Sequence, residues 1–170
     1  MDFGGINPVI LLASLMVAST PILLAALGEM VTEKSGVLNL GVEGMMIFGA
    51  VCGFIAAIET QSPAIGFVAA AIGGAALSML FGLLTQIFLT TQVPAGLALT
   101  LLGTGLASLL GQNYQGMSPP RLPDMNIPLL EDIPVIGPVI FQHDAIVYLS
   151  LIMVVVVWAF LKFTGSCTGI

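Results

Sequence analysis

Long apolar segments, separated by short polar ones, dominate the chain. A helix needs about 20 apolar residues to cross the hydrocarbon core of a bilayer, and five segments are apolar over about that length. Each is continuously apolar, without the alternation that a transmembrane strand requires. The pattern therefore predicts an all-α, polytopic transmembrane helix bundle within a single domain. The five expected spans are residues 8–28, 37–58, 63–89, 93–111 and 145–163.

The polar segments divide these spans unequally. Residues 29–36 form a polar segment after the first span, and residues 112–143 form a long one before the last. The second segment is rich in proline, which blocks long helices, so an extramembrane loop is expected there. Pro21 lies inside the first span, where we expect it to kink the helix.

Composition strengthens the membrane interpretation. Hydrophobic residues make up 58% of the 170 residues, and charged residues only 7%. A soluble domain carries about 25% charged residues, so a soluble enzyme is excluded as the default. Nucleic-acid binding is excluded too, because Lys34, Arg121 and Lys162 are too few to neutralise a phosphate backbone.

The few cations also predict an orientation. Alternating crossings put Lys34 and Lys162 on one side of the membrane and Arg121 on the other. Cytoplasmic segments carry an excess of Lys and Arg. We therefore expect a multi-pass protein of the cell membrane with an extracytoplasmic N-terminus, an extracytoplasmic loop at 112–143 and a cytoplasmic C-terminus.

Most of the candidate functional residues lie just before and at the start of the second span. An acid near membrane depth is costly and should face protein or water, and glycines between the acids allow a broken helix near residues 36–44. One interpretation is a discontinuous helix beside a transport path. The other is an ordinary cytoplasmic loop with Glu43 satisfied at a helix contact. The substrate-path candidates are Glu29, Glu33, Asn39 and Glu43, with Gln92 as a secondary one.

Other kinds of site find no support in the sequence. Cys52 and Cys167 are far apart and show no metal-ligand spacing. No catalytic motif and no phosphate-binding loop is present. We therefore expect no catalytic residue, no metal, no cofactor and no nucleotide site in this chain, and an intramembrane enzyme is disfavoured.

Small residues recur at helical spacing within the spans. Such stripes let transmembrane helices approach closely, and tight structural packing is the expected role, with the lining of a narrow path as the alternative. The helix-packing candidates are Gly49, Gly53, Gly66, Gly74, Ser78, Gly82, Gly96 and Gly103.

Three stretches resemble those of a known family. The first is GEMVTEKSGVLNLGVEGMMIFGA at residues 28–50, followed by QVPAGLALTLLGTGLASLLG at 92–111 and the loop PPRLPDMNIPLLEDIPVIGPVIF at 119–141. They are similar to segments of bacterial ABC importer permeases of the simple-sugar and nucleoside group. That group is related to the ribose and branched-chain amino-acid permeases.

The resemblance implies a function and a set of partners. It implies translocation of a nucleoside or simple sugar by alternating access. It also implies ABC ATPase subunits that consume the ATP, a second permease subunit and an extracytoplasmic substrate-binding protein, with the lipid bilayer around the spans. The loop at 112–143 would then suit contact with the binding protein.

One departure from the family pattern lies at the end of the chain. Family members continue after the fifth span into a basic cytoplasmic segment that docks on the ATPase, whereas here the atypical tail 164–170 follows. We therefore expect this chain to be the N-terminal part of a longer family domain. The alternatives are a truncated, non-transporting membrane protein with a structural or assembly role, and a branched-chain amino-acid permease.

Overall fold

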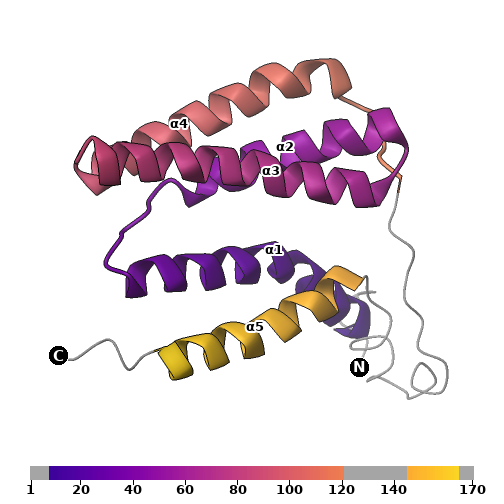
Figure 1. Cartoon of the computed structure of the whole chain (residues 1–170). Coiled ribbons are helices and arrows are strands. Elements are labelled where there is room, and N and C mark those ends of the chain that lie inside the picture. The colour runs from indigo at the N-terminus through magenta and orange to yellow at the C-terminus, as the bar shows by residue number, and fades with distance from the viewer. Residues whose placement is uncertain (1–7, 121–144, 165–170) are drawn as a thin grey trace. The chain divides into compact units, whose positions relative to one another are not determined.

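The computed structural model describes residues 8–120 and 145–164, and every regular element in these ranges is helical. The all-α prediction is therefore confirmed for the described part of the chain. Within it, five helices are long and apolar enough to cross a membrane. The elements are α1 (Pro8–Lys34), α2 (Val42–Thr60), α3 (Pro63–Gly82), the π-helical turn η1 (Leu83–Ile87), α4 (Gln92–Gly111), the short 3-10 turn η2 (Gln112–Tyr114) and α5 (Ala145–Thr164) (Figure 1).

The chain divides into two compact units. One contains α1 as far as Val31 together with α5, and the other comprises residues 32–121. Most of the loop expected at 112–143 and most of the tail 164–170 lie outside the described residues. The candidate site and the predicted small-residue contacts fall in the unit that contains α2, α3 and α4.

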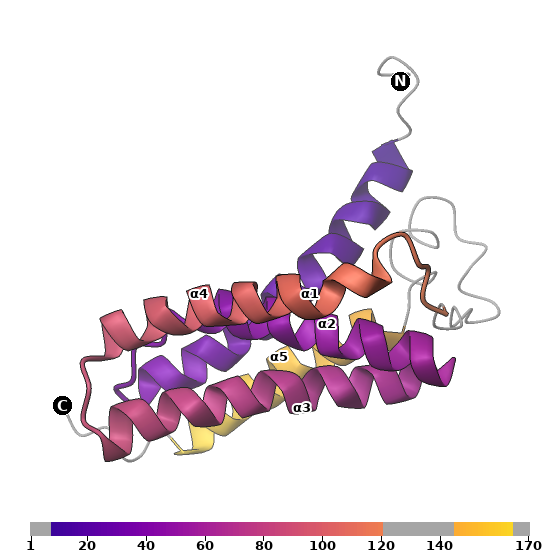
Figure 2. The same cartoon turned by 90° about the horizontal axis from the view of Figure 1, so that it is seen from above.

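The first helix is longer than its apolar segment. The expected span ends at Gly28, but α1 continues through the polar residues to Lys34. Pro21 lies inside α1, which Figure 2 shows as a bent helix. Proline removes one backbone donor and its ring crowds the preceding turn. The bend follows from that local conflict, as the sequence predicts.

The third span ends in a widened turn. The expected span reaches residue 89, whereas α3 ends at Gly82 and a π-helical turn follows as far as Ile87. There the Phe88 N–H donates to the Leu83 carbonyl at 3.1 Å. The Leu84 carbonyl accepts from both the backbone N–H (3.1 Å) and the hydroxyl (2.7 Å) of Thr90. These bonds satisfy carbonyls that the end of a helix leaves free.

Three helices form the body of the second unit. Figures 1 and 2 show α2, α3 and α4 side by side, with connections that alternate between the two ends of the unit. The α2–α3 connection is very short, since α2 ends at Thr60 and α3 begins at Pro63. Proline suits the first turn of a helix, because an N–H there has no partner within the helix. At the same end, the Tyr114 hydroxyl donates to Glu59 Oε1 at 2.7 Å and ties η2 to the end of α2.

Helix α2 meets α3 through glycine on both sides. A Cβ added at Gly53 would lie 2.7 Å from the carbonyl oxygen of Gly66, and one at Gly66 would lie 2.8 Å from that of Gly53. A Cβ at Gly49 would lie 2.9 Å from the Ala70 carbonyl oxygen. Such distances are too short for any side chain, so these positions must be glycine for the two backbones to pack this closely.

Helix α4 approaches the start of α2 even more tightly. A Cβ at Gly44 would lie 2.5 Å from Thr100 Cα, and one at Gly103 would collide with the carbonyl group of Gly44. Gly96 faces the backbone just before α2, where a Cβ would lie 2.9 Å from the Leu40 nitrogen. Backbone atoms therefore touch backbone atoms at this contact.

The other small residues on the predicted stripes lie differently. A Cβ at Gly74 would come no closer than 3.8 Å, to the Met45 carbonyl oxygen, which is ordinary contact. Gly82 has nothing within 4 Å of such a Cβ, and Ser78 is exposed. Gly73 is in close contact instead, with a Cβ position 2.9 Å from Cys52 Sγ. The inward face of α3 is thus offset from the regular four-residue stripe.

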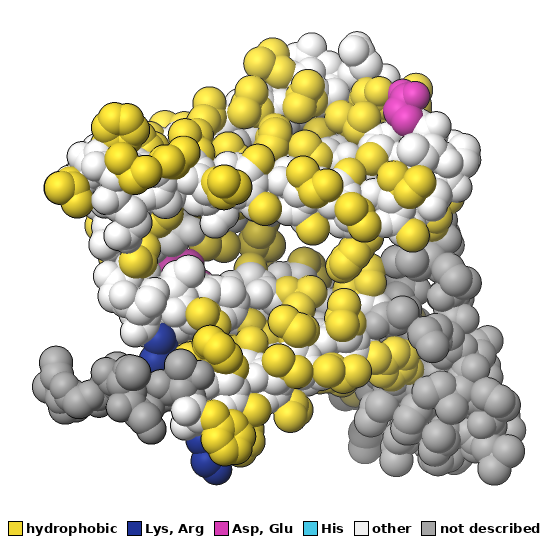
Figure 3. Space-filling view, in the orientation of Figure 1, with side chains coloured by type: hydrophobic (Ala, Val, Ile, Leu, Met, Phe, Trp, Pro, Cys, Tyr) yellow, Lys and Arg dark blue, Asp and Glu magenta, His cyan; other side chains and the backbone are white. Residues whose placement is uncertain are grey.

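Apolar side chains cover the outside of the unit as well as its centre. Met45, Leu77, Phe81 and Leu99 form a small buried cluster. Large apolar side chains are exposed on each of the five helices, and the face in Figure 3 carries many of them, with charged groups as isolated spots. An exterior of this kind suits lipid rather than water.

The glycine contact between α2 and α4 leads to a matched pair of substitutions on α4. We expect Gly103→Ala to destabilise the protein by about 1–3 kcal/mol, because the new methyl group overlaps the Gly44 backbone. Gly105→Ala should be neutral or stabilising by about 1 kcal/mol, because a Cβ there meets nothing within 4 Å. Unfolding in detergent by titration with a denaturing detergent measures both. Equal effects of the two variants would contradict the packing described here.

Candidate functional site

The candidate site is the non-helical segment that joins α1 to α2, residues 35–41. Helix α1 ends in a two-bond cap in which the Val37 N–H donates to the Thr32 carbonyl at 3.1 Å and the Gly36 N–H donates to that of Glu33 at 2.9 Å. Gly36 has a φ of +83°, which glycine adopts without strain. The chain therefore leaves α1 at a defined point and starts again as a helix at Val42.

Two side chains of α4 hold this segment through its backbone. The Leu38 N–H donates to Gln92 Oε1 at 2.8 Å, and the Thr100 hydroxyl donates to the Leu40 carbonyl at 3.0 Å. Gly96 lies between them and lets the segment approach α4 closely. This non-helical segment, called the break below, is thus fixed to the first half of α4 by the Gln92 acceptor, the Thr100 donor and the missing side chain at Gly96.

The Thr100 hydroxyl has two acceptors within reach. Besides the Leu40 carbonyl it lies 3.3 Å from the carbonyl oxygen of Gly96, one turn earlier in its own helix. A threonine hydroxyl carries one donor hydrogen, so these carbonyls compete for it. The bond between α4 and the segment can therefore be exchanged for a bond within α4.

Asn39 fixes the segment from inside. Its side chain is 7% exposed, and its Oδ1 accepts from the Gly41 N–H at 2.9 Å. Its Nδ2 also donates to Met45 Sδ at 3.6 Å, a weak acceptor. An asparagine that bonds to the backbone two residues on stabilises a turn. Asn39 thereby sets the direction in which the chain enters α2.

Each of the three acidic candidates has a different setting. Glu33 lines a shallow depression of about 310 Å³ together with Gly36, Val37 and Leu38. Glu43 lies in the first turn of α2 and is exposed, a position where a carboxylate suits the positive end of the helix dipole. Glu29 lies in the part of α1 that belongs to the other compact unit.

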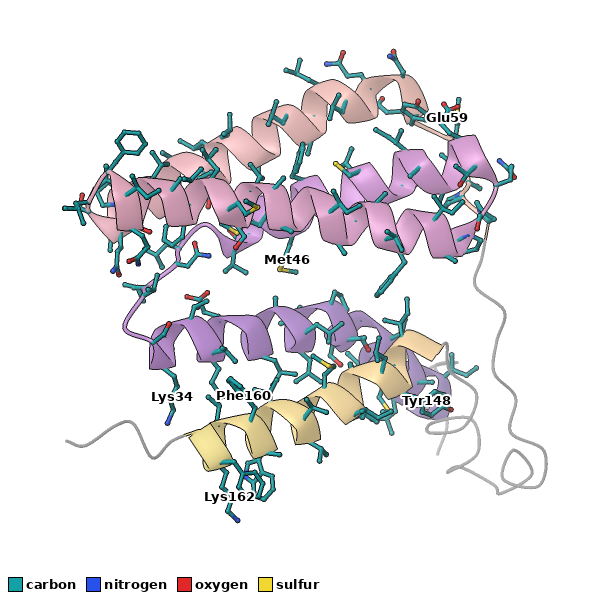
Figure 4. All side chains as sticks on the ribbon, in the orientation of Figure 1. Lys34, Met46, Glu59, Tyr148, Phe160 and Lys162 are labelled. Atoms are coloured by element: carbon teal, nitrogen blue, oxygen red, sulfur yellow. The ribbon has the colours of Figure 1, made fainter. Side chains whose placement is uncertain are left out.

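The structure therefore places Asn39 within the segment and Gln92 against its backbone, with Glu33 beside its start. Figure 4 shows Lys34 at the end of α1, where the break begins, and Glu59 at the far end of α2. The groups at the break are amide, hydroxyl and backbone dipoles with carboxylates at the edge. Such a set can bind neutral polar groups by hydrogen bonds. Within the described residues, no cluster of three His, Cys, Asp or Glu side chains suits a metal ion.

Two residues that act here, Thr100 and Gly44, are not among the candidate residues that the sequence indicates. The break ends at Gly41, and Gly44 is helical and in contact with α4. The sequence does contain a signal for this contact. Gly96, Thr100 and Gly103 share one face of α4, and such a face of small residues needs a closely packed partner, which a glycine such as Gly44 can provide.

The geometry predicts how the segment responds to the loss of its acceptor. We expect Gln92→Ala to raise hydrogen–deuterium exchange in the peptide covering residues 37–41 about fivefold, because one net hydrogen bond of about 1 kcal/mol is lost. Mass spectrometry of the protein in detergent measures this exchange. The control is Gln86→Ala, at an exposed glutamine just before the α3–α4 connection, which should leave that peptide unchanged. Equal exchange in both variants would contradict the role of Gln92.

Comparison with known proteins gives these features a context. A putative glucose ABC transporter permease protein from Haloferax volcanii is 41% identical over 89% of this chain and 47% of its own length. A guanosine ABC transporter permease protein from Bacillus subtilis is 30% identical over 91% of the chain and 51% of its own length. A nucleoside ABC transporter permease protein from Lactococcus lactis is 26% identical over 88% of the chain and 50% of its own length.

The chain thus spans about half the length of these curated relatives. No solved structure matches it. A family model described as the branched-chain amino acid transport system / permease component matches residues 11–166, which cover the five candidate membrane-spanning helices of the described chain, apart from Ile10 in the first, and the non-helical segment at 35–41. The chain is therefore a multi-pass membrane protein that belongs to this family of transport-system permease components.

Proposed function

We propose that this chain forms part of the permease subunit of an ATP-driven importer, and that the subunit moves a nucleoside or simple sugar across the membrane by alternating access. The observation that carries the proposal is the non-helical segment at residues 35–41, bound to α4 by Gln92 and Thr100, in a chain that the family model matches over residues 11–166. Breaks of this kind occur in transporters where backbone groups line a binding site or a cavity.

The substrate class follows from the chemistry of the break and from the names of the relatives. Glucose, nucleosides and guanosine are named for the three relatives. All of these are neutral and carry several hydroxyl groups, which need directional donors and acceptors more than net charge. Asn39, Gln92 and Thr100 supply such groups, with Glu33 and Glu43 as carboxylate acceptors at the edge of the break. Glu29 remains a candidate of the same kind.

The mechanism uses the exchangeable bond of Thr100. When its hydroxyl turns from the Leu40 carbonyl to that of Gly96, the segment loses one of its two hydrogen bonds to α4 side chains. The carbonyl of Leu40 is then available to a hydroxyl group of the substrate. Occupancy of the site is in this way coupled to the position of the segment relative to α4.

The energy and the delivery of substrate come from partners. We infer that the complete subunit works with ABC ATPase subunits, which hydrolyse the ATP, with a second permease subunit and with an extracytoplasmic substrate-binding protein. The family match and the names of the relatives support this assembly. The described residues contain no phosphate-binding loop of the kind that ATP hydrolysis requires.

The orientation that we propose follows from the positive-inside rule. Lys34, at the end of α1, and Lys162, near the end of α5, lie on the cytoplasmic side. The N-terminus and the end of α4 then face outward. In the second unit, residue 35 and η2 lie at opposite ends of α2, which lets this proposal be tested within one compact body.

Cysteine accessibility tests that orientation. In a background with Cys52 and Cys167 replaced by serine, a cysteine at Gln115 should react with a membrane-impermeant maleimide added to intact cells. A cysteine at Ser35 should react only after the membrane is opened, because it lies at the opposite end of the unit. Both side chains are exposed in the structure. Labelling of Ser35→Cys in intact cells, without labelling of Gln115→Cys, would reverse the orientation.

Uptake tests the function. In cells whose own gene is deleted, the wild-type gene should restore uptake of a labelled nucleoside or simple sugar. We expect Glu43→Gln to lower that uptake about tenfold at equal membrane abundance, because a hydrogen bond to a charged acceptor is worth about 1.5 kcal/mol or more. Glu59→Gln is the matched control, since it changes the other acid of α2 at the far end of the helix.

Three outcomes would each contradict one part of the proposal. Uptake of a branched-chain amino acid that depends on the gene would reassign the substrate. Normal uptake of every solute in the deletion strain, with no ATPase recovered on purification, would favour a structural or assembly role. An equal loss of uptake in both variants would remove Glu43 from the substrate path and leave the permease assignment standing.

A further inference from the structure

The end of α5 carries an aromatic and a cationic side chain in direct contact. The Lys162 ammonium lies 4.8 Å from the centre of the Trp158 ring, one helical turn before it. Residues four apart lie on the same face of a helix. Trp158 is 58% exposed and Phe163 is 79% exposed, so this end of α5 presents two aromatic rings outward around one cation. In Figure 4, Lys162 points away from α5 on the side opposite Phe160.

The length of α5 fixes the depth of these side chains. Its apolar part, Ile146–Phe163, has 18 residues. At a rise of 1.5 Å per residue this is about 27 Å, slightly less than the hydrocarbon thickness of about 30 Å. A helix of that length spans the core only if both of its ends reach the headgroup layers. Lys162 therefore lies at the boundary, where tryptophan rings also prefer to be.

The charge at this end of α5 lacks an acidic neighbour on its own helix. The residues of α5 include no Asp or Glu, and Lys162 is the basic residue of its last turn. A tryptophan ring attracts an ammonium through its negative face. It leaves the other N–H donors of the ammonium directed outward. Those donors need an acceptor that the headgroup layer can supply, and a phosphate is the strong one there.

We infer that Trp158 and Lys162 form a binding site for the phosphate of an anionic lipid headgroup at the end of α5. The ring holds the ammonium in place, the ammonium binds the phosphate, and Phe163 packs against the start of the acyl chains. This site anchors α5 in one leaflet, and it does not depend on which solute, if any, the protein transports.

The fluorescence of Trp158 tests the site directly, because the chain contains a single tryptophan. The full chain is reconstituted in vesicles of phosphatidylcholine that contain a small fraction of brominated lipid. Bromines near the glycerol end of the acyl chains should quench Trp158 more than bromines near the methyl end. Brominated phosphatidylglycerol should bind next to the ring about fivefold more strongly than brominated phosphatidylcholine, the preference expected for one lysine near an anionic lipid.

Two matched variants distinguish the effect of Lys162 on lipid preference from the effect of the protein's overall charge. In Lys162→Gln the fivefold preference should fall to none while the depth of the ring stays the same. Lys34→Gln removes the other described lysine and should leave the preference intact. Both lysines are exposed, and circular dichroism checks that each variant is folded.

Each other result would overturn the inference. Strongest quenching by bromines at the methyl end would place the ring in the middle of the bilayer. A preference that persists in Lys162→Gln would assign the lipid contact to another group. An equal change on adding inorganic phosphate to phosphatidylcholine vesicles would make the site one for free phosphate. A fluorescence change seen only with a soluble protein partner would make it a protein contact.

Discussion

The close approach of bare backbones is the constraint on which the unit of α2, α3 and α4 depends. In lipid no hydrophobic effect drives helices together, so packing must come from many short contacts. Gly53 and Gly66 let α2 touch α3, while Gly44 and Gly103 let it touch α4. Backbone-to-backbone contacts leave little freedom to slide. They therefore set the register between α2 and α4, which in turn determines where the chain before α2 must run.

That register explains how the non-helical backbone at residues 35–41 finds hydrogen-bond partners on α4. A break exposes backbone groups, and in a membrane these need protein or water partners. Here the Leu38 N–H finds Gln92, the Leu40 carbonyl finds Thr100, and Asn39 holds the Gly41 N–H. All three partners are neutral. Neutral bonds are easier to exchange than buried ion pairs, and an exchangeable segment is what a binding site in a moving protein requires.

Some of these residues could be recognised from the sequence, and others could not. Asn39 and Gln92 were recognisable because a polar side chain in or beside an apolar span is costly without a role. Pro21 was recognisable from covalent geometry alone. Thr100 was not singled out for the break, because a threonine on a small-residue stripe looks the same whether it packs or binds. The regular stripe on α3 was only a partial guide, since Gly73 lies in close contact and Gly82 does not.

The sequence by itself determined that the chain crosses a membrane as helices, because length and hydropathy alone decide that a segment prefers lipid. It also indicated a polar, glycine-containing segment between the first two spans, but left open whether this is a discontinuous helix or an ordinary loop. Only the tertiary structure decided that α1 runs on to Lys34, that α2 starts at Val42, and that Gln92 and Thr100 reach the break. The contacts of Gln92 and Thr100 join residues more than 50 positions apart in the chain, which no local pattern can place together.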